Sequence, residues 1–286
     1  YQWAEDLFPY NRSLSGKYNR KTLNYIKNIL PDLKIKSFKS GTKVFDWTVP
    51  DEWNVDEAYI EDSNGNKVID FKNNNLHLVS YSEPVDLFIS LSELKNKLYT
   101  LKDKPDAIPY ITSYYKKDWG FSLSYNDFKN LKDDRYHVVI NSKFSKGEVN
   151  YGELIIPGNT DQEILLSTYI CHPSMANNEI SGIVVTTALA KMILEIKDRR
   201  YTYRIIFIPE TIGAVAYLSL HHKKMKLKTV AGFVVTCVGD DNNYSFLPSR
   251  LGNTYTDEVA LYALNNYCSK GFNKYSFLER GSDERQ

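Results

Sequence analysis

The chain has 286 residues, enough for one large domain or for a domain with a smaller module. Its composition of 42% hydrophobic and 25% charged residues is that of an ordinary globular protein, and the formal net charge of +1 gives no electrostatic case for binding nucleic acid or an anionic membrane. No apolar run is long enough to span a membrane, and the three cysteines form no disulfide framework, so we expect a reducing compartment such as the cytoplasm.

The first fifty residues predict one helix followed by strands. Residues 20–30 place Leu23, Ile26 and Leu30 on one face of an amphipathic helix, and Pro31 ends it. Residues 33–38 and 42–49 alternate apolar and polar side chains, which is typical of strands.

Short segments and frequent turn signals mark residues 47–115. Asn64-Gly65 separates two alternating segments and predicts a hairpin, and Ser90 with Glu93 predicts the capping box of a short helix. Residues 75–81 alternate as another strand would. These short strands and turns predict a small β domain at 47–115, inserted into a larger domain formed by 1–46 and 116–286. The stretch 47–115 holds no cluster of acids, bases and metal-binding residues.

Beyond residue 124 the sequence changes to alternating strands and helices. Residues 136–141 and 149–156 predict two strands paired around Lys146-Gly147. Three apolar runs then predict buried strands, which alternate with predicted helices, and a last strand is expected at 275–278. The buried strands are 164–170, 203–208 and 231–238, and the helices are 183–196, 214–220 and 256–267. This order predicts an α/β fold with a mixed, mostly parallel sheet flanked by helices.

Polar residues follow each of the buried strands. His172 and Glu179 follow the first, Glu210 the second and Asp240 the third, and Asp283 follows the last strand candidate. Because the carboxyl ends of parallel strands meet at one edge of a sheet, we expect these residues to lie close together. A histidine with several carboxylates is a ligand set that zinc accepts, with one carboxylate left over as general base.

The roles within this cluster stay open at this point. Glu210 suits the general base, because a Pro-Glu turn at the end of a buried strand offers a partly desolvated carboxylate. The plainer alternative is that His172 only hydrogen-bonds its own turn and that Glu179 is a solvated charge at the start of a helix.

Longer motifs resemble a known family. The segments CHPSMANNEISG, FIPETIG, FVVTCVGDD and RGSDERQ, together with LFPYNRSLSG and IPYITSYYKKDWGF, look like the aminopeptidase-like proteins associated with polysaccharide biosynthesis. That family is similar to the zinc-dependent exopeptidases, and the resemblance implies their fold with an inserted β domain. It also implies a winged-helix end and a further metal-binding histidine beyond Gln286, so we expect the chain to be truncated.

The resemblance to the zinc exopeptidases is partial at the metal site. Four positions that are acidic in those enzymes hold neutral residues here, and these are Ser174, Asn178, Thr211 and Thr236. The resemblance therefore implies one zinc ion rather than two. Its ligands would be His172, a carboxylate from the following turn and the histidine beyond the chain. Glu179 is the preferred carboxylate, because an amide oxygen is a poor zinc ligand, whereas Asn178 occupies the position that the older family would use.

The function implied is that of a zinc-dependent, aminopeptidase-like hydrolase that cleaves an amide bond, with Glu210 activating water. Asp283 and Arg285 would shape the substrate pocket, with Asp240 nearby. The substrate would be a small peptide or an amide-bearing sugar, the latter in a deacetylase-like reaction. The alternative is a catalytically silent relative that binds a sugar or peptide in surface polysaccharide biosynthesis. Oligomeric state has no signal in the sequence.

Overall fold

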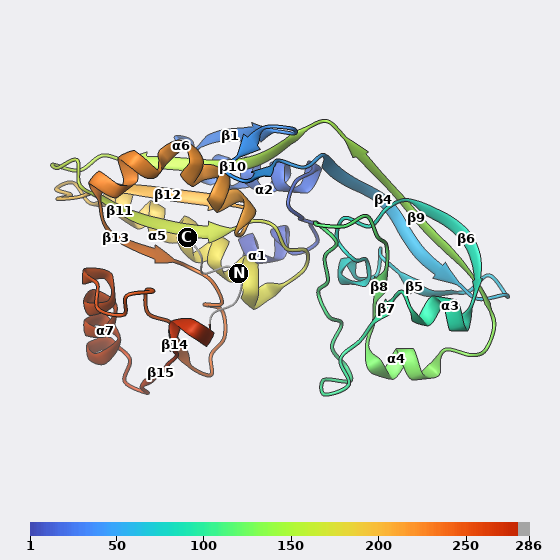
Figure 1. Cartoon of the computed structure of the whole chain (residues 1–286). Coiled ribbons are helices and arrows are strands. Elements are labelled where there is room, and N and C mark those ends of the chain that lie inside the picture. Colours follow the sequence, from blue (N-terminus) through green and yellow to red (C-terminus); the bar gives the residue numbers. More distant parts are fainter. Residues whose placement is uncertain (280–286) are drawn as a thin grey trace. The chain divides into compact units, whose positions relative to one another are not determined.

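The computed structural model describes residues 1–279 and divides the chain into two compact units. Unit 1 comprises Tyr1–Pro50 and Glu148–Gln286, and unit 2 comprises Asp51–Gly147. Each unit has its own principal sheet (Figure 1). Within the described residues no helix is long and apolar enough to cross a membrane.

The sheet of unit 1 has five strands and is mixed. Its order is β1-β10-β12-β11-β13, in which β1, β10 and β12 pair antiparallel and β12, β11 and β13 pair parallel. The strands are β1 (Lys34–Lys39), β10 (Glu148–Ile156), β11 (Glu163–Tyr169), β12 (Thr202–Ile208) and β13 (Thr229–Val234). The predicted α/β fold with a mixed sheet is confirmed.

Helices cover both faces of this sheet, which makes unit 1 a three-layer structure (Figure 1). The helices are α1 (Gln2–Leu7), α2 (Lys17–Ile29), α5 (Ser181–Glu195) and α6 (Ile212–Lys228). Side chains alternate along β12, so that Ile205 and Phe207 pack with α1, α2 and α5. On the other face, Ile206 and Ile208 pack against α6. The helix predicted at 183–196 corresponds to α5, whose Met192 and Leu194 are exposed.

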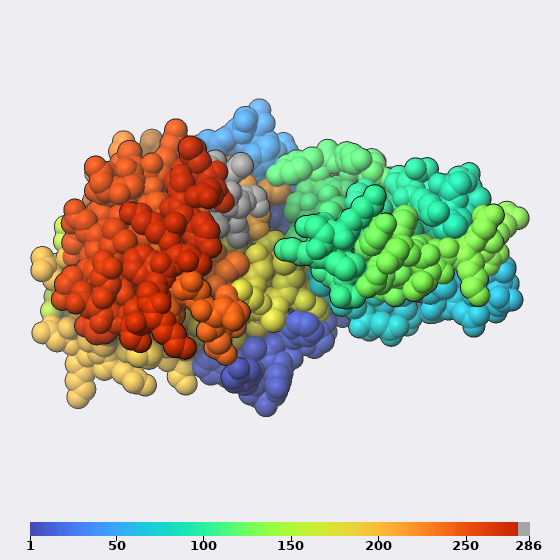
Figure 2. Space-filling model, turned by 90° about the horizontal axis from the view of Figure 1, so that it is seen from below, coloured from blue at the N-terminus to red at the C-terminus, as the bar shows by residue number. Residues whose placement is uncertain are grey.

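The chain after β13 forms short elements with many exposed aromatic side chains. They are β14 (Tyr244–Phe246), α7 (Tyr255–Tyr267), β15 (Phe272–Lys274) and a 3₁₀ turn at Phe277–Glu279, and they occupy one continuous surface of unit 1 (Figure 2). The strand expected at 275–278 is wrong. The Ser276 hydroxyl accepts from the Leu278 N–H, and the Glu279 carboxylate accepts from the Ser276 N–H, so local side-chain bonds stabilise a turn there.

Unit 2 is built on an antiparallel sheet with the order β5-β4-β9-β6. Its elements are β4 (Glu52–Glu61), β5 (Lys67–Asp70), β6 (Val85–Ser90), α3 (Leu91–Lys95), β7 (Leu98–Tyr99), β8 (Phe121–Ser122), α4 (Tyr125–Asn130) and β9 (Arg135–Ser145). The hairpin between β4 and β5 is confirmed, with Gly65 in the left-handed region at φ 79°. The capping box of Ser90 and Glu93 is also confirmed.

Three local predictions differ from the structure. β9 pairs with β4 and β6, and β10 pairs with β1 and β12, so the predicted pairing of β9 with β10 is wrong. Residues 42–49 form two short strands, β2 (Lys43–Val44) and β3 (Trp47–Thr48), separated at Phe45 by a φ of 50°. Residues 75–77 form a 3₁₀ turn, because the Asn74 side chain caps it by accepting from the Leu76 N–H.

The extent of unit 2 also differs from the expected insertion at 47–115. Unit 2 runs on to Gly147, because β9 lies at the centre of its sheet between β4 and β6. That the two units are separate domains stays a prediction.

A buried ionic network ties the starts of β11 and β12 to their neighbours. The guanidinium group of Arg204 donates to both oxygens of Glu163 at 2.6 and 2.8 Å and to Glu153 at 3.0 Å. The Tyr217 hydroxyl accepts from Arg204 at 2.7 Å and donates to Glu153 at 2.5 Å. The ammonium group of Lys36 also pairs with Glu153, so two cations face the two carboxylates of this network.

Arg204→Met tests this network. Removing the guanidinium leaves the buried Glu163 carboxylate without its ion-pair partner and leaves Glu153 with Lys36 as its cation. We therefore expect the free energy of unfolding to fall by about 3–5 kcal/mol. Urea unfolding followed by circular dichroism measures it. A loss below about 1 kcal/mol would show that the network contributes no more than an ordinary surface contact.

The thermal stability of the protein should depend on pH through the protonation of His137. Its imidazole contacts Asp86 at 2.7 Å and Glu61 at 3.4 Å. The hydrogen bond to Asp86 raises the pKa of His137. Because the folded pKa lies above the unfolded value of about 6.5, this stabilisation is present below about pH 6.5 and is lost as the pH rises through the folded pKa. Thermal unfolding should therefore show the wild type exceeding His137→Gln by more at about pH 6 than at about pH 9. A Tm difference that stays constant with pH would contradict this assignment.

Candidate active site

The parallel strands of unit 1 bring three chain segments to one edge of the sheet. β11 runs parallel to both β12 and β13, so the residues after Tyr169, Ile208 and Val234 meet at that edge. The end of β11 is anchored by the buried Asn19 of α2, whose amide donates to the carbonyls of Ile170 at 2.8 Å and Ser13 at 2.6 Å.

His172 lies at the centre of this edge with both ring nitrogens in contact with carboxylates. Its Nδ1 lies 2.6 Å from Glu179 Oε2, and its backbone N–H donates to the same oxygen at 2.7 Å. Its Nε2 lies 3.0 Å from Glu210 Oε2. The structure therefore brings together the histidine and two of the acids that the sequence singled out.

Glu179 has a second partner that we did not predict. Arg12 donates from Nε to Glu179 Oε1 at 2.9 Å and from Nη1 to the Leu7 carbonyl at 2.7 Å. The side chains of Arg12 and Glu179 are both 0% exposed. Arg12 comes from the segment between α1 and α2, which carries no periodicity, so its only signal was its place within the motif LFPYNRSLSG.

A wide helical turn places Glu179. Residues Ala176–Ile180 form a π-helical turn that leads directly into α5. Such turns add a residue to a helix and change the direction of nearby side chains, and they are frequent at functional sites. Here the turn holds Glu179 buried under His172, rather than solvated at the start of a helix as the plainer interpretation had it.

The start of α5 also lies very close to the ends of β11 and β13. A Cβ atom on Gly182 would be 2.4 Å from the Val235 carbonyl oxygen and 2.5 Å from Thr168 Oγ1. Ser181 Oγ accepts from the Val238 N–H at 3.0 Å, and Asn177 Oδ1 accepts from the Gly239 N–H at 2.8 Å. Glycine at 182 thus permits the contact that fixes the turn of Glu179 against the sheet.

Cys171 is a third donor beside His172 and Glu210. Its Sγ accepts from the Glu210 N–H at 3.1 Å, and ligand atoms of these three residues lie within 4.8 Å of one another. Burial raises the pKa of the Cys171 thiol to about 11, so the thiol is protonated at neutral pH and is a poor nucleophile. Burial lowers the pKa of His172, but the Glu179 carboxylate beside Nδ1 outweighs that effect and holds the pKa well above its ordinary value.

Nitrogen, carboxylate and sulfur donors in one cluster are the ligand types that zinc takes in proteins, so these residues fit a zinc ion. Glu179 and Asn178, which we expected as ligands, are not part of this group. The two oxygens of Glu179 are engaged by Arg12 and His172. Asn178 Oδ1 is buried with no hydrogen-bond partner among residues 1–279.

Neutral residues gather where a second metal ion would need acids. The Thr236 hydroxyl donates to the Asn178 carbonyl at 2.9 Å, so the two positions that are acidic in the zinc exopeptidases lie side by side here without charge. A bridging carboxylate is therefore lacking at both.

Of the three residues predicted to bind substrate, the structure describes Asp240. Asp240 is exposed and accepts from the N–H groups of Asn242 and Asn243, so its contacts lie within its own turn. Asp283 and Arg285 lie outside the described residues.

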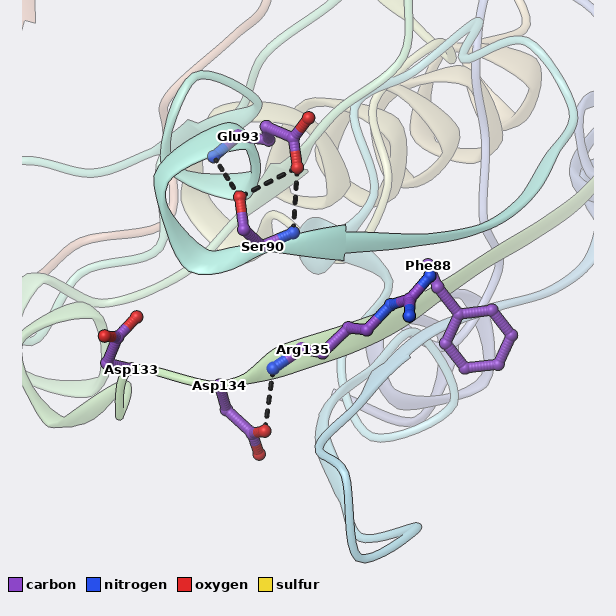
Figure 3. A pocket seen from close by; sticks show the side chains of 6 residues that line it. All are labelled: Phe88, Ser90, Glu93, Asp133, Asp134 and Arg135. Carbon is purple, nitrogen blue, oxygen red and sulfur yellow. Dashed lines mark hydrogen bonds between the residues drawn. The ribbon is translucent and has the colours of Figure 1, made fainter.

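A separate hollow of about 490 Å³ lies on unit 2 (Figure 3). It is lined by Phe88, Ser90, Glu93, Asp133, Asp134 and Arg135. Glu93 is used by the capping box with Ser90, and Asp134 accepts from the Arg135 N–H at 2.7 Å. The hollow contains no histidine or cysteine, so we place the candidate site at the sheet edge of unit 1 instead.

The fold defines the class of protein. A zinc aminopeptidase from Bacillus subtilis matches with a TM-score of 0.67 at 14% identity, over 99% of this chain and 78% of that one. A peptidase M28 precursor from Shewanella amazonensis SB2B matches with a TM-score of 0.67 at 12% identity, over 99% and 80%. At these identities the likeness shows the fold, which is that of the zinc aminopeptidases.

The family follows from closer matches. The model described as "Domain of unknown function (DUF4910)" matches residues 1–286, and the chain belongs to this family. A candidate polysaccharide biosynthesis protein with an aminopeptidase-like domain, from Clostridium acetobutylicum, is 47% identical over 100% of this chain and 65% of its own length. A crystal structure of a peptidase candidate from the same organism matches with a TM-score of 0.93 at 46% identity, over 100% of this chain and 67% of that one. The resemblance to the aminopeptidase-like family is confirmed, and the chain spans about two thirds of these relatives.

The thiols offer a direct test of the site's burial. Cys171 is buried with a pKa of about 11, whereas Cys237 is exposed. Because only the thiolate reacts, iodoacetamide at neutral pH should modify Cys237 first and Cys171 only after unfolding. Peptide mass spectrometry of a time course measures both rates, and Cys237→Ser identifies the fast site. Equal labelling of both cysteines in the folded protein would contradict the buried position of Cys171.

Proposed function

We propose that this chain carries the active site of an aminopeptidase-like hydrolase that cleaves an amide bond with the help of one zinc ion. The observation that supports it is the 3.0 Å approach of His172 Nε2 to Glu210 Oε2 at the carboxyl ends of parallel strands. This is where open α/β sheets carry their sites, and a zinc aminopeptidase shares the fold.

His172 is the anchor of the proposed metal site. Its Nδ1 is held by Glu179, so its Nε2 is the nitrogen that faces Glu210 and the metal. Cys171 is the other proposed donor, and Glu210 lies within reach of both residues. We propose that Glu179 orients the imidazole instead of ligating the metal, as carboxylates behind zinc-bound histidines commonly do. Zinc, when bound, would lower the pKa of a water molecule and polarise the amide carbonyl.

Glu210 is the proposed general base. Its side chain is 17% exposed, compared with 8% for His172, so it reaches toward solvent while staying partly desolvated. It would accept the proton of the attacking water and pass it to the leaving amine. A protonated, buried Cys171 cannot serve as the nucleophile in its place.

The substrate remains part of the proposal. The fold favours a small peptide, and an amide-bearing sugar is the alternative; the name of the Clostridium acetobutylicum relative refers to polysaccharide biosynthesis. We propose that Asp240, Asp283 and Arg285 line the substrate side of the site.

A catalytically silent protein that binds a sugar or peptide is the second candidate. The neutral pair of Asn178 and Thr236 favours it, because the site lacks the acids that a two-metal peptidase would use there. The His172 and Glu210 pair favours the enzyme, since a silent relative has no need to hold these two groups in contact.

Two variants and two matched controls test the hydrolase proposal. Glu210→Gln should lower kcat against aminoacyl amides about 10²–10⁴-fold while zinc still binds, because it removes the general base. His172→Ala should remove both zinc and activity. Glu195→Gln and His222→Ala change exposed residues of the same types and should behave as wild type. Kinetics with peptide and N-acetyl sugar substrates, alongside metal analysis, give the readout.

Unchanged activity of Glu210→Gln would refute the mechanism. A protein without zinc that still binds an oligosaccharide would support the silent alternative.

A further inference from the structure

Arg12 is a fully buried cation in a segment that precedes the sheet of unit 1. It is 0% exposed and lies between α1 and α2, 167 residues before its partner Glu179. Burying a guanidinium group costs free energy unless it is paired and fully hydrogen-bonded. One of its nitrogens, Nη2, has no hydrogen-bond partner among residues 1–279. An arginine retained only for stability would be expected to satisfy all of its donors.

The two carboxylate oxygens of Glu179 bind different partners. Oε1 accepts from Arg12 Nε at 2.9 Å, and Oε2 accepts from the His172 backbone N–H at 2.7 Å and contacts Nδ1 at 2.6 Å. Arg12 therefore fixes the rotation of the carboxylate, and the carboxylate fixes the imidazole ring. Arg12 itself is held by its bond to the Leu7 carbonyl at the end of α1.

We propose that Arg12 is a positioning residue of this site, acting through Glu179 to keep His172 Nδ1 engaged and Nε2 directed at Glu210. This inference rests on the proposed function for the meaning of the site, but the arrangement itself can be tested without activity. Arg12, Glu179 and His172 form one relay from the N-terminal segment to the sheet edge.

Removing Arg12 should therefore change the orientation of the His172 ring. Without Arg12, Glu179 Oε1 loses the donor that fixes the carboxylate, so the carboxylate can rotate or shift away from His172. Either change removes or weakens the acceptor for the imidazole, which can then rotate. Loss of such an orienting partner behind a metal-binding histidine typically lowers metal affinity 10–100-fold.

Arg204 supplies a matched control. It is also a buried arginine paired with buried carboxylates, but it binds Glu163 at the first residue of β11, whereas His172 follows the other end of that strand. Arg204→Met and Arg12→Met therefore make the same chemical change in the same unit. Both should lower stability, and only the second should change the site.

The experiment compares these two variants with wild type by two readouts below their unfolding temperatures. Chelator competition gives the Kd for zinc, and proton–nitrogen NMR of the metal-free protein follows the His172 Nδ1–H. We expect Arg12→Met to weaken zinc binding about 10–100-fold and to lose the hydrogen-bonded Nδ1–H signal. Arg204→Met should keep both. Glu179→Gln should resemble Arg12→Met, because it removes the same charged acceptor.

Two results would overturn the proposal: an unchanged Nδ1–H signal in folded Arg12→Met, or equal losses in Arg12→Met and Arg204→Met. If Arg12→Met does not fold, Arg12→Lys compared with Arg204→Lys decides the question by the same readouts. If the wild type binds no zinc while the Nδ1–H signal still depends on Arg12, the positioning role stands and the proposed hydrolase fails.

Discussion

The site depends on one buried interaction, the hydrogen bond between His172 Nδ1 and the Glu179 carboxylate. It is 2.6 Å long and is closed to solvent on the Glu179 side, where the exposed fraction is 0%. In such an environment a carboxylate needs a cation, and Arg12 supplies it. The other ring nitrogen, Nε2, then lies 3.0 Å from Glu210 Oε2. A charged group in the N-terminal segment thus determines how a residue at the end of β11 is presented.

The fold brings the polar residues after β11, β12 and β13 together, and the neutral residues among them limit which metal ligands are present. Parallel pairing of β11 with β12 and β13 brings their ends to one edge, and Gly182 lets α5 begin against that edge. Where the zinc exopeptidases carry further acids, Asn178 and Thr236 hydrogen-bond through neutral groups. Cys171, His172 and Glu210 remain as the group that could hold a metal ion, and the ring of His172 contacts Glu179 seven residues later.

Much of this arrangement was predictable because it is local or periodic. The apolar runs at β11 and β12 and the polar residues after them placed His172 and Glu210 at one edge. Strand pairings and side-chain contacts between residues far apart in the sequence could not be predicted from single segments. β9 and β10 follow each other in sequence, but they join different sheets because their partners lie far away in the chain. Arg12 carried no pattern, since its partner is 167 residues away and its burial is a property of the folded unit.

The central claim is that His172 Nε2, and not Glu179, faces the metal. An anomalous density map collected at the zinc edge from crystals of the zinc-loaded protein tests it most directly. Our account predicts one zinc peak within bonding distance of His172 Nε2, on the side of Glu210, with Glu179 still bonded to Arg12 and Nδ1. A peak on Glu179 or Asn178, or two peaks, would contradict it.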